Sequence, residues 1–321
     1  MDAGQSREGA GLGDAWRDHR RYVLDVAYRM LGSITEAEDV VQEAFARLLH
    51  EDLDRIEDVR GWLVVVVSRL CLDLLRSARS RREAYVGPWL PEPLIQPPGA
   101  EPDPADRVTL DDSVRMAMLV VLERLSPAER AAFVLHDVFQ FSFEDIGRIV
   151  GRSPAACRQL ASRARRHVRG QTGPARFDVD PKELRRVADR FIEASSEGDL
   201  DALMDVLDPD VAGWTDSGGR VGAPRRAVTG RQRVAERFMK FLQDFHVTLV
   251  AMPVNGEPGV LAFQEDRLLA VIAFETQAGL ITRIHSIANP QKLAYVASML
   301  AWGPEAEGPT RSALHFGPDP A

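Results

Sequence analysis

The chain has 321 residues, 45% of them hydrophobic, which is long enough for two or three folded domains. Acidic residues outnumber basic ones by 48 to 40, but the charges are segregated along the chain, so the net charge of −8 does not exclude nucleic-acid binding. The cysteines, Cys71 and Cys157, are too few for a disulfide framework or a metal cluster, and we expect neither a metal nor a cofactor. Without a secretory signal or a membrane-length apolar run, the sequence predicts a cytoplasmic protein with no membrane partner.

The N-terminal part is predicted to be helical from about residue 14 to residue 85, after a glycine-rich start that we expect to be frayed. The helix expected at residues 36–49 has an apolar stripe of Ala37, Val40, Val41, Ala44, Phe45 and Leu48. Its opposite face is polar and acidic, with Glu36, Asp39, Gln42 and Glu43. Such a face is either simply solvated or binds a basic partner surface in a fast, salt-sensitive association.

The next predicted helix, residues 60–82, is apolar in its first half and basic in its second. The β-branched run at residues 63–67 would suit a buried strand, but the length and the helical surroundings favour a helix. Trp62 is expected to be a core residue. Arginines of this segment can neutralise DNA phosphates: Arg69, Arg76, Arg79, Arg81 and Arg82.

Prolines interrupt residues 88–104 so often that no regular structure is expected there. Inside this linker, residues 89–94 read Trp-Leu-Pro-Glu-Pro-Leu, which is unusually apolar. A free Trp with two Leu is unfavourable unless it docks on another surface, whereas the alternative interpretation is a stiff spacer.

After helices expected at 111–125 and 127–138, residues 141–169 form the most informative pattern: two short helices joined at 150–152. Ser153 and Pro154 suit a helix start and Gly151 a left-handed helix end. Cys157, Leu160, Ala161, Ala164 and Val168 form an inward face. The opposite face is basic and hydrogen-bonding, as a major-groove recognition helix requires, although a solvated arginine-rich helix is the alternative. The predicted DNA contacts are Ser153, Arg158, Gln159, Ser162, Arg163, Arg165 and Arg166, of which Arg158 and Gln159 can read bases while Arg165 suits phosphate. Glu144 and Asp145 are expected to be surface charges.

From residue 178 the pattern changes to helices at 181–197, 200–207 and 230–245, followed by strands at 247–254, 260–263, 268–275 and 280–287. Turn signals at 255–256, 265–266 and 278–279 separate these strands. Helices followed by a β-meander indicate an α+β domain.

These motifs resemble the bacterial extracytoplasmic-function sigma factors of RNA polymerase. Residues 27–45 resemble the core-binding part of sigma region 2, residues 61–76 its −10 part, and residues 125–168 sigma region 4. The chain is most similar to the SigJ-like subgroup, which has a SnoaL-like domain fused to its C-terminus. Three motifs of that subgroup are present: residues 89–94, 216–220 (Asp-Ser-Gly-Gly-Arg) and 289–293 (Asn-Pro-Gln-Lys-Leu).

The resemblance implies a multidomain chain with two all-α sigma domains and an α+β SnoaL-like conical barrel. Its expected parts are region 2 at 14–86, a linker at 87–110, region 4 with its helix-turn-helix at 111–172, the SnoaL-like domain at 178–302 and a disordered tail at 303–321. The implied partners are promoter DNA and the RNA polymerase core, through its β′ clamp and β flap. The acidic helix would bind the core, the basic helix the −10 element and the recognition helix the −35 element.

The resemblance also implies regulation in cis, because the C-terminal domain would contact the linker and the sigma regions. The residues expected to take part are Trp89, Leu90, Pro91, Glu92, Pro93, Leu94, Asp216, Gly218, Gly219, Arg220, Asn289, Pro290, Lys292 and Leu293.

Two other functions stay open at this point. One is an ordinary helix-turn-helix regulator with a ligand-binding domain, which would leave residues 36–82 unexplained. The other is a SnoaL-like enzyme with Asp216, His246 or His285 as acid–base group. No nucleophile motif or cofactor loop is present, so we expect no enzymatic activity, while a small ligand in the C-terminal domain remains an open partner.

Overall fold

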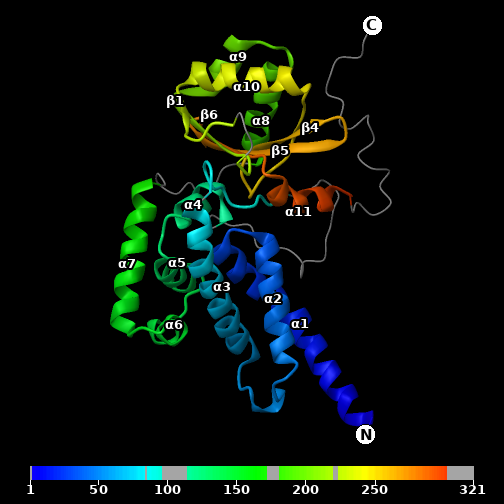
Figure 1. Cartoon of the computed structure of the whole chain (residues 1–321), viewed down its shortest axis with the longest axis vertical. Helices are drawn as coiled ribbons and strands as arrows, with labels where there is room; N and C mark the ends of the chain where they lie inside the picture. The colour runs from blue at the N-terminus through cyan, green and yellow to red at the C-terminus, as the bar shows by residue number, and fades with distance from the viewer. Residues whose placement is uncertain (1, 84, 96–113, 172–180, 220–222, 302–321) are drawn as a thin grey trace. The chain divides into compact units, whose positions relative to one another are not determined.

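The computed structural model of the chain describes residues 2–83, 85–95, 114–171, 181–219 and 223–301. The chain folds into two compact units (Figure 1). The first contains residues 1–83 and 101–175, and the second contains residues 84–100 and 176–321. The apolar linker motif therefore belongs to the same unit as the C-terminal domain. No helix in the described part of the chain is long and apolar enough to cross a membrane.

The first unit begins with three helices, α1 (Asp2–Leu31), α2 (Ile34–Leu48) and α3 (Val59–Glu83), with a 3-10 turn, η1 (Leu53–Arg55), before α3. The expected frayed start was wrong, because α1 begins at Asp2. No proline interrupts this stretch, and a helix that has nucleated extends at little cost. Ser33 caps α2 by accepting a hydrogen bond from the Glu36 N–H at 3.0 Å. The apolar stripe expected on α2 is confirmed as buried.

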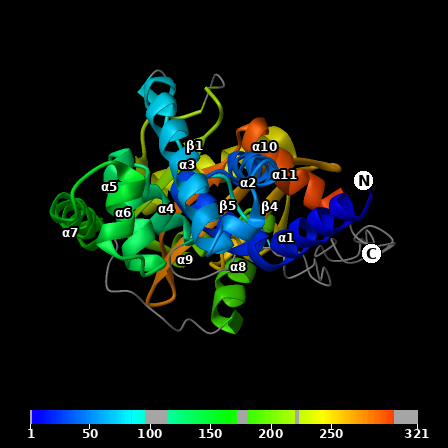
Figure 2. The same ribbon diagram turned by 90° about the horizontal axis from the view of Figure 1, so that it is seen from below.

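The rest of the first unit consists of α4 (Met116–Leu122), α5 (Pro127–Phe133), a π-helical turn η4 (Val134–Val138), α6 (Phe143–Val150) and α7 (Pro154–Gln171). Gly151 ends α6 with φ +72°, and the Ser153 hydroxyl accepts a hydrogen bond from the Ala156 N–H, as expected. A Cβ on Gly147 would lie 2.7 Å from the Arg152 carbonyl oxygen, so only glycine allows this close turn. Both views show α6 beside α7 (Figures 1 and 2).

A buried guanidinium connects the two helical parts of this unit. Arg130 of α5 is 1% exposed, and its Nε donates to the Arg29 carbonyl of α1 at 3.3 Å. Its other side lies 2.7 Å from the Glu123 carboxylate. Nearby, the Arg29 guanidinium lies 5.5 Å from the centre of the Phe139 ring. Arg130 therefore links α5 to α1, while α3 packs on both of these helices.

The second unit is built on a six-stranded mixed sheet with the order β2-β1-β6-β5-β4-β3. β1 pairs in parallel with β6, whereas the other neighbours are antiparallel. Neither β1 nor β2 was predicted, because Pro209 and Gly213 lower the strand propensity of β1 and its main pairing is non-local. The strands are β1 (Leu207–Asp216), β2 (Val228–Thr229), β3 (Thr248–Ala251), β4 (Gly259–Gln264), β5 (Arg267–Gln277) and β6 (Leu280–Ile287).

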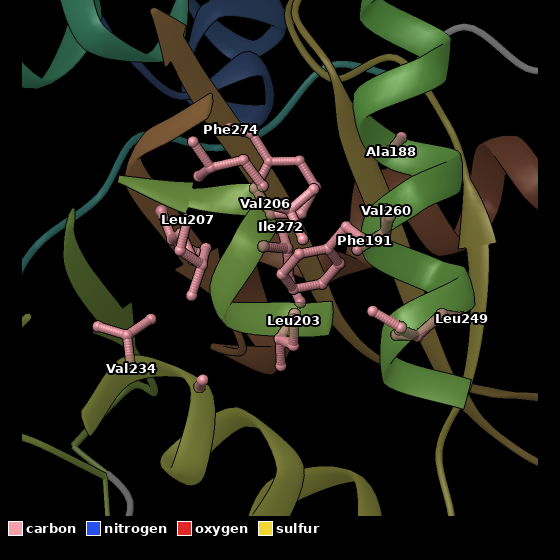
Figure 3. Close-up of a cluster of buried hydrophobic side chains, with 14 of the residues drawn as sticks. Ala188, Phe191, Leu203, Val206, Leu207, Val234, Leu249, Val260, Ile272 and Phe274 are labelled. Atoms are coloured by element: carbon pink, nitrogen blue, oxygen red, sulfur yellow. The ribbon is translucent and has the colours of Figure 1, made fainter. Parts of the chain in front are cut away.

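Helices cover both faces of this sheet. α8 (Pro181–Ser196), α9 (Leu200–Val206) and α10 (Arg231–Phe245) pack on one face through a hydrophobic cluster that includes Phe191, Leu203 and Phe274 (Figure 3). α11 (Pro290–Ala301) packs on β5 from the other side (Figure 1). α11 was not predicted as a helix. The α+β class expected for this unit is confirmed.

Candidate functional site

The outward face of α7 carries the side chains expected to contact DNA. Arg158, Gln159, Ser162, Arg163 and Arg166 line one concavity, and Ser153 is exposed at the start of the helix. The inward residues Cys157, Leu160, Ala161, Ala164 and Val168 are buried, as expected. The division into two faces follows from the helical period and needs no long-range contact.

Acidic side chains of preceding elements hold the arginines of this face. Arg158 lies 3.5 Å from Glu144 of α6, Arg163 lies 3.2 Å from Glu129 of α5, and Arg165 lies 3.2 Å from Asp137 of η4. Burial raises the pKa of Asp137, although the nearby Arg165 charge opposes this shift. Burial alone would raise the pKa of Glu129 as well, but hydrogen bonds from Ser126 and the charge of Arg163 bring it below its ordinary value. These acids were missed as site residues, since their spacing from α7 in sequence gives no local signal.

The basic helix α3 is only partly described. Arg69 is exposed and donates to the Arg148 carbonyl at 3.1 Å, and Arg76 forms an exposed ion pair with Asp73 at 3.2 Å. The side chains of Arg79, Arg81 and Arg82 lie outside the described residues. Trp62 is half-buried rather than a full core residue.

The acidic face of α2 is available to a partner. Asp39, Gln42 and Glu43 are exposed, and Glu36 is half-buried at the start of the helix. Glu43 forms an exposed ion pair with Arg47 at 2.8 Å. Exposed pairs of this kind contribute little to stability, so a partner can replace them at low cost.

In the second unit, Asp216 at the end of β1 accepts hydrogen bonds from the linker. The Leu90 N–H donates to its carboxylate at 2.9 Å, and the Tyr85 hydroxyl donates to the same group. Asn289 donates to the Tyr85 hydroxyl at 3.2 Å. Burial and the neighbouring Asp216 carboxylate raise the pKa of Tyr85 above its ordinary value, so the phenol stays protonated and can donate.

Lys292 of α11 completes this cluster. Its ammonium group lies 2.7 Å from the Asp216 carboxylate and also donates to the Leu90 carbonyl. The ring of Trp89 covers the ammonium, with 3.4 Å between the nitrogen and the ring centre. Gly218 and Gly219 follow Asp216 with φ +70° and +80°, which explains the glycines of this motif.

A second contact holds the end of the linker motif. The Asn255 N–H donates to the Leu94 carbonyl at 2.8 Å, and the Leu94 N–H donates to the Asn255 side-chain oxygen at 3.0 Å. Ile95 and Val254 form an antiparallel β-bridge beside it. Asn255 was predicted only as a turn residue, because its Asn-Gly pair suggests a turn and nothing in the local sequence points to the linker.

The other motif residues have these positions. Pro91, Glu92 and Pro93 are buried within the docked segment, Leu293 is buried in α11 and Pro290 is exposed at its start. Arg220 lies outside the described residues.

The three side chains considered for acid–base catalysis are not brought together. Asp216 is engaged by the linker, and His246 is exposed at the end of α10. The buried His285 lies 2.7 Å from Glu275 and stacks on Trp214, while its Nδ1 has no hydrogen-bond partner among the described residues. Asp216 and His285 share the sheet face that is opposite to the hydrophobic cluster, since their strand partners alternate with residues of that cluster. Within the described residues, no group of His, Cys, Asp and Glu is arranged to hold a metal ion.

Comparisons with known proteins agree across nearly the whole chain. Sigma-70 region 2 matches residues 15–81, sigma-70 region 4 matches residues 115–168, and a SnoaL-like domain matches residues 188–284. The chain is 46% identical to the probable ECF RNA polymerase sigma factor SigI of Mycobacterium tuberculosis, over 90% of this chain and 97% of that protein. It is 41% identical to ECF RNA polymerase sigma factor SigJ of the same organism, over 85% of this chain and 90% of that protein. The crystal structure of SigJ superposes with a TM-score of 0.69 at 36% identity, covering 86% of this chain and 95% of that one.

Proposed function

Because this chain belongs to the extracytoplasmic-function sigma factors and directs promoter-specific transcription initiation, we propose that its SnoaL-like domain regulates initiation in cis. The observation that carries this proposal is the docking of the linker on Asp216, Lys292 and Asn255. The linker connects the two sigma regions, so a domain that holds it acts on both.

The polymerase core and promoter DNA are the partners of the sigma regions. The exposed acidic face of α2 supports binding to the β′ clamp, because a basic partner surface would attract Asp39 and Glu43. The β flap is the partner we propose for region 4. The arginines of α3 would contact the −10 element, and the outward face of α7 would read the −35 element in the major groove.

Linker docking is proposed to act on the spacing of the two promoter contacts. About 30 residues connect α3 to Val114, and at roughly 3.3–3.6 Å per residue a free chain of that length can span ~100 Å. When residues 85–95 are docked, about a third of this connection is fixed on the C-terminal domain and cannot extend freely. The domain would thereby favour some relative placements of the −10 and −35 contacts over others, as an anti-sigma factor does from outside.

A regulatory domain agrees better than an enzyme with the chemistry of the second unit. Asp216, one of the three acid–base candidates, is buried and hydrogen-bonded to Leu90, Tyr85 and Lys292. The interior between the sheet and α8–α10 is filled by apolar side chains (Figure 3). We propose no catalytic step for this domain, and a small ligand would act by changing the docking of the linker.

In vitro transcription with purified core polymerase and full-length protein tests the proposal. Lys292→Met removes the ammonium that holds both Asp216 and Leu90, and we expect promoter output to change several-fold. Lys240→Met is the matched control, because Lys240 is exposed and pairs with Asp244 on its own helix. Equal output from both variants and the wild type would refute regulation through the linker, as would unchanged output after deletion of residues 178–321.

A further inference from the structure

We infer that Glu144 and Phe143 of α6 position Arg158 for base recognition, so that they determine −35 specificity without contacting a base. This inference rests on the proposed role of α7 in reading the −35 element. Arg158 NH2 lies 3.5 Å from the Glu144 carboxylate, and the guanidinium lies 5.4 Å from the centre of the Phe143 ring. Glu144 thus pairs with one edge of the guanidinium, and the Phe143 ring faces the guanidinium plane.

Two helix caps and a tight turn fix the backbone that carries these contacts. Ser142 caps α6 by accepting a hydrogen bond from the Asp145 N–H at 3.1 Å, and Ser153 caps the start of α7. The turn between them needs the close approach of Gly147 to the Arg152 carbonyl. Glu144 and Arg158 are therefore carried by two helices whose relative position is set by caps and by the turn.

Positioning matters for an arginine because its long side chain loses much rotamer freedom when it binds. A guanidinium that is already held loses less of this freedom on reaching the DNA. It has five N–H donors, so an edge taken by Glu144 leaves other donors for a guanine. A good bidentate arginine–guanine pair discriminates strongly against other bases.

The neighbouring Asp145 offers a comparison within the same helix turn. It carries the same charge, but its carboxylate accepts a hydrogen bond from the Ser142 hydroxyl and forms an ion pair with Arg148 of α6. Removing either acid changes the local charge equally, so any general electrostatic effect on DNA affinity is common to both. Of these two acids, Glu144 is the one that contacts Arg158, so its removal should change the conformation of that side chain.

The test compares Glu144→Gln with Asp145→Asn in the full-length protein bound to core polymerase. Initiation is measured on a set of promoters in which each −35 base pair is replaced in turn. For Glu144→Gln we expect the preference at one base pair to fall about two- to five-fold, the range expected for the loss of an exposed ion pair. Asp145→Asn should keep the wild-type preference at every position. Glu144 is exposed and Asp145 is half-buried, and thermal denaturation should confirm that both variants fold.

Further variants separate the outcomes. Arg158→Ala should lose the preference at the same base pair, and adding Glu144→Gln to it should change nothing more. Phe143→Tyr, which keeps the ring, should retain the preference, whereas Phe143→Leu should weaken it.

A uniform change across all promoters with Glu144→Gln would overturn the inference while leaving the role of α7 intact. If Arg158→Ala alters the preference at no −35 position, the proposed role of α7 in reading that element through Arg158 fails instead.

Discussion

The Lys292 ammonium lies 2.7 Å from the Asp216 carboxylate, and both side chains are buried, at 5% and 0% exposed. Two charges removed from water gain from each other only if their remaining hydrogen bonds are satisfied. Here Leu90 supplies both a donor to Asp216 and an acceptor for Lys292. The hydrogen bonds of this buried ion pair are therefore satisfied only while the linker is docked.

Breaking this pair should destabilise the second unit. Lys292→Met leaves the Asp216 carboxylate buried without its counter-charge, and losses of about 3–5 kcal/mol are typical of such a change. Urea denaturation of the full-length protein, followed by tryptophan fluorescence, measures the effect. Combining Lys292→Met with Asp216→Asn should recover part of the loss. A loss no larger than that of the surface variant Lys240→Met would contradict the buried pair.

Asn255 should hold the linker through its side-chain oxygen. Asn255→Gly keeps the positive φ of +53° but removes the acceptor for the Leu94 N–H, which costs about 1 kcal/mol or more. Chymotrypsin cleavage after Tyr85 and Trp89 should then become roughly five-fold faster. Asn255→Asp keeps an acceptor oxygen and should be cleaved at the wild-type rate. Equal rates for the two variants would mean that the side chain does not anchor the linker.

Arg130 should be essential for linking α5 to α1. Arg130→Met removes the buried ion pair with Glu123 and the hydrogen bond to the Arg29 carbonyl, so we expect a loss of about 3–5 kcal/mol. Arg148→Met, at an exposed site with a surface ion pair, should cost less than about 1 kcal/mol. Thermal and urea unfolding of both variants gives the comparison, and similar losses would rule out the special role of Arg130.

The Glu275 carboxylate should make stability depend on acidic pH. Burial alone would raise its pKa, but the hydrogen bond from His285 and the charges of His285 and Arg283 hold it below the ordinary value. A lowered folded-state pKa means that the stabilisation is present above about pH 4.3 and is lost as the pH falls through the folded-state value. Unfolding free energies of wild type and Glu275→Gln, measured from pH 7 to pH 3, should converge at the acidic end. If the two unfolding free energies differ by the same amount at every pH, the ionisation of Glu275 does not contribute to stability.

Local patterns predicted many of the elements. α2, α3, α6 and α7 follow from helical periodicity and from capping residues such as Ser33 and Ser153, which act over a few residues. β3 to β6 follow from short apolar runs between turn signals. β1 and α11 were missed because their stability comes from partners far away in the chain, β6 for the strand and β5 for the helix.

By itself the sequence determined the chemistry available: an outward basic face on α7, an acidic face on α2 and an apolar linker that needs a surface to cover it. Only the tertiary structure decided which side chains meet. Asp216 and Lys292 are 76 residues apart, and Asp216 and Leu90 are 126 apart. The register of β1 on β6 and the packing of α11 on β5 bring the charged pair together. Likewise Glu144 reaches Arg158 through the turn at Gly151. Periodicity and capping residues reflect interactions between neighbours in the sequence. The contacts of Asp216 with Lys292 and Leu90 instead depend on pairing between distant segments, which no local pattern encodes.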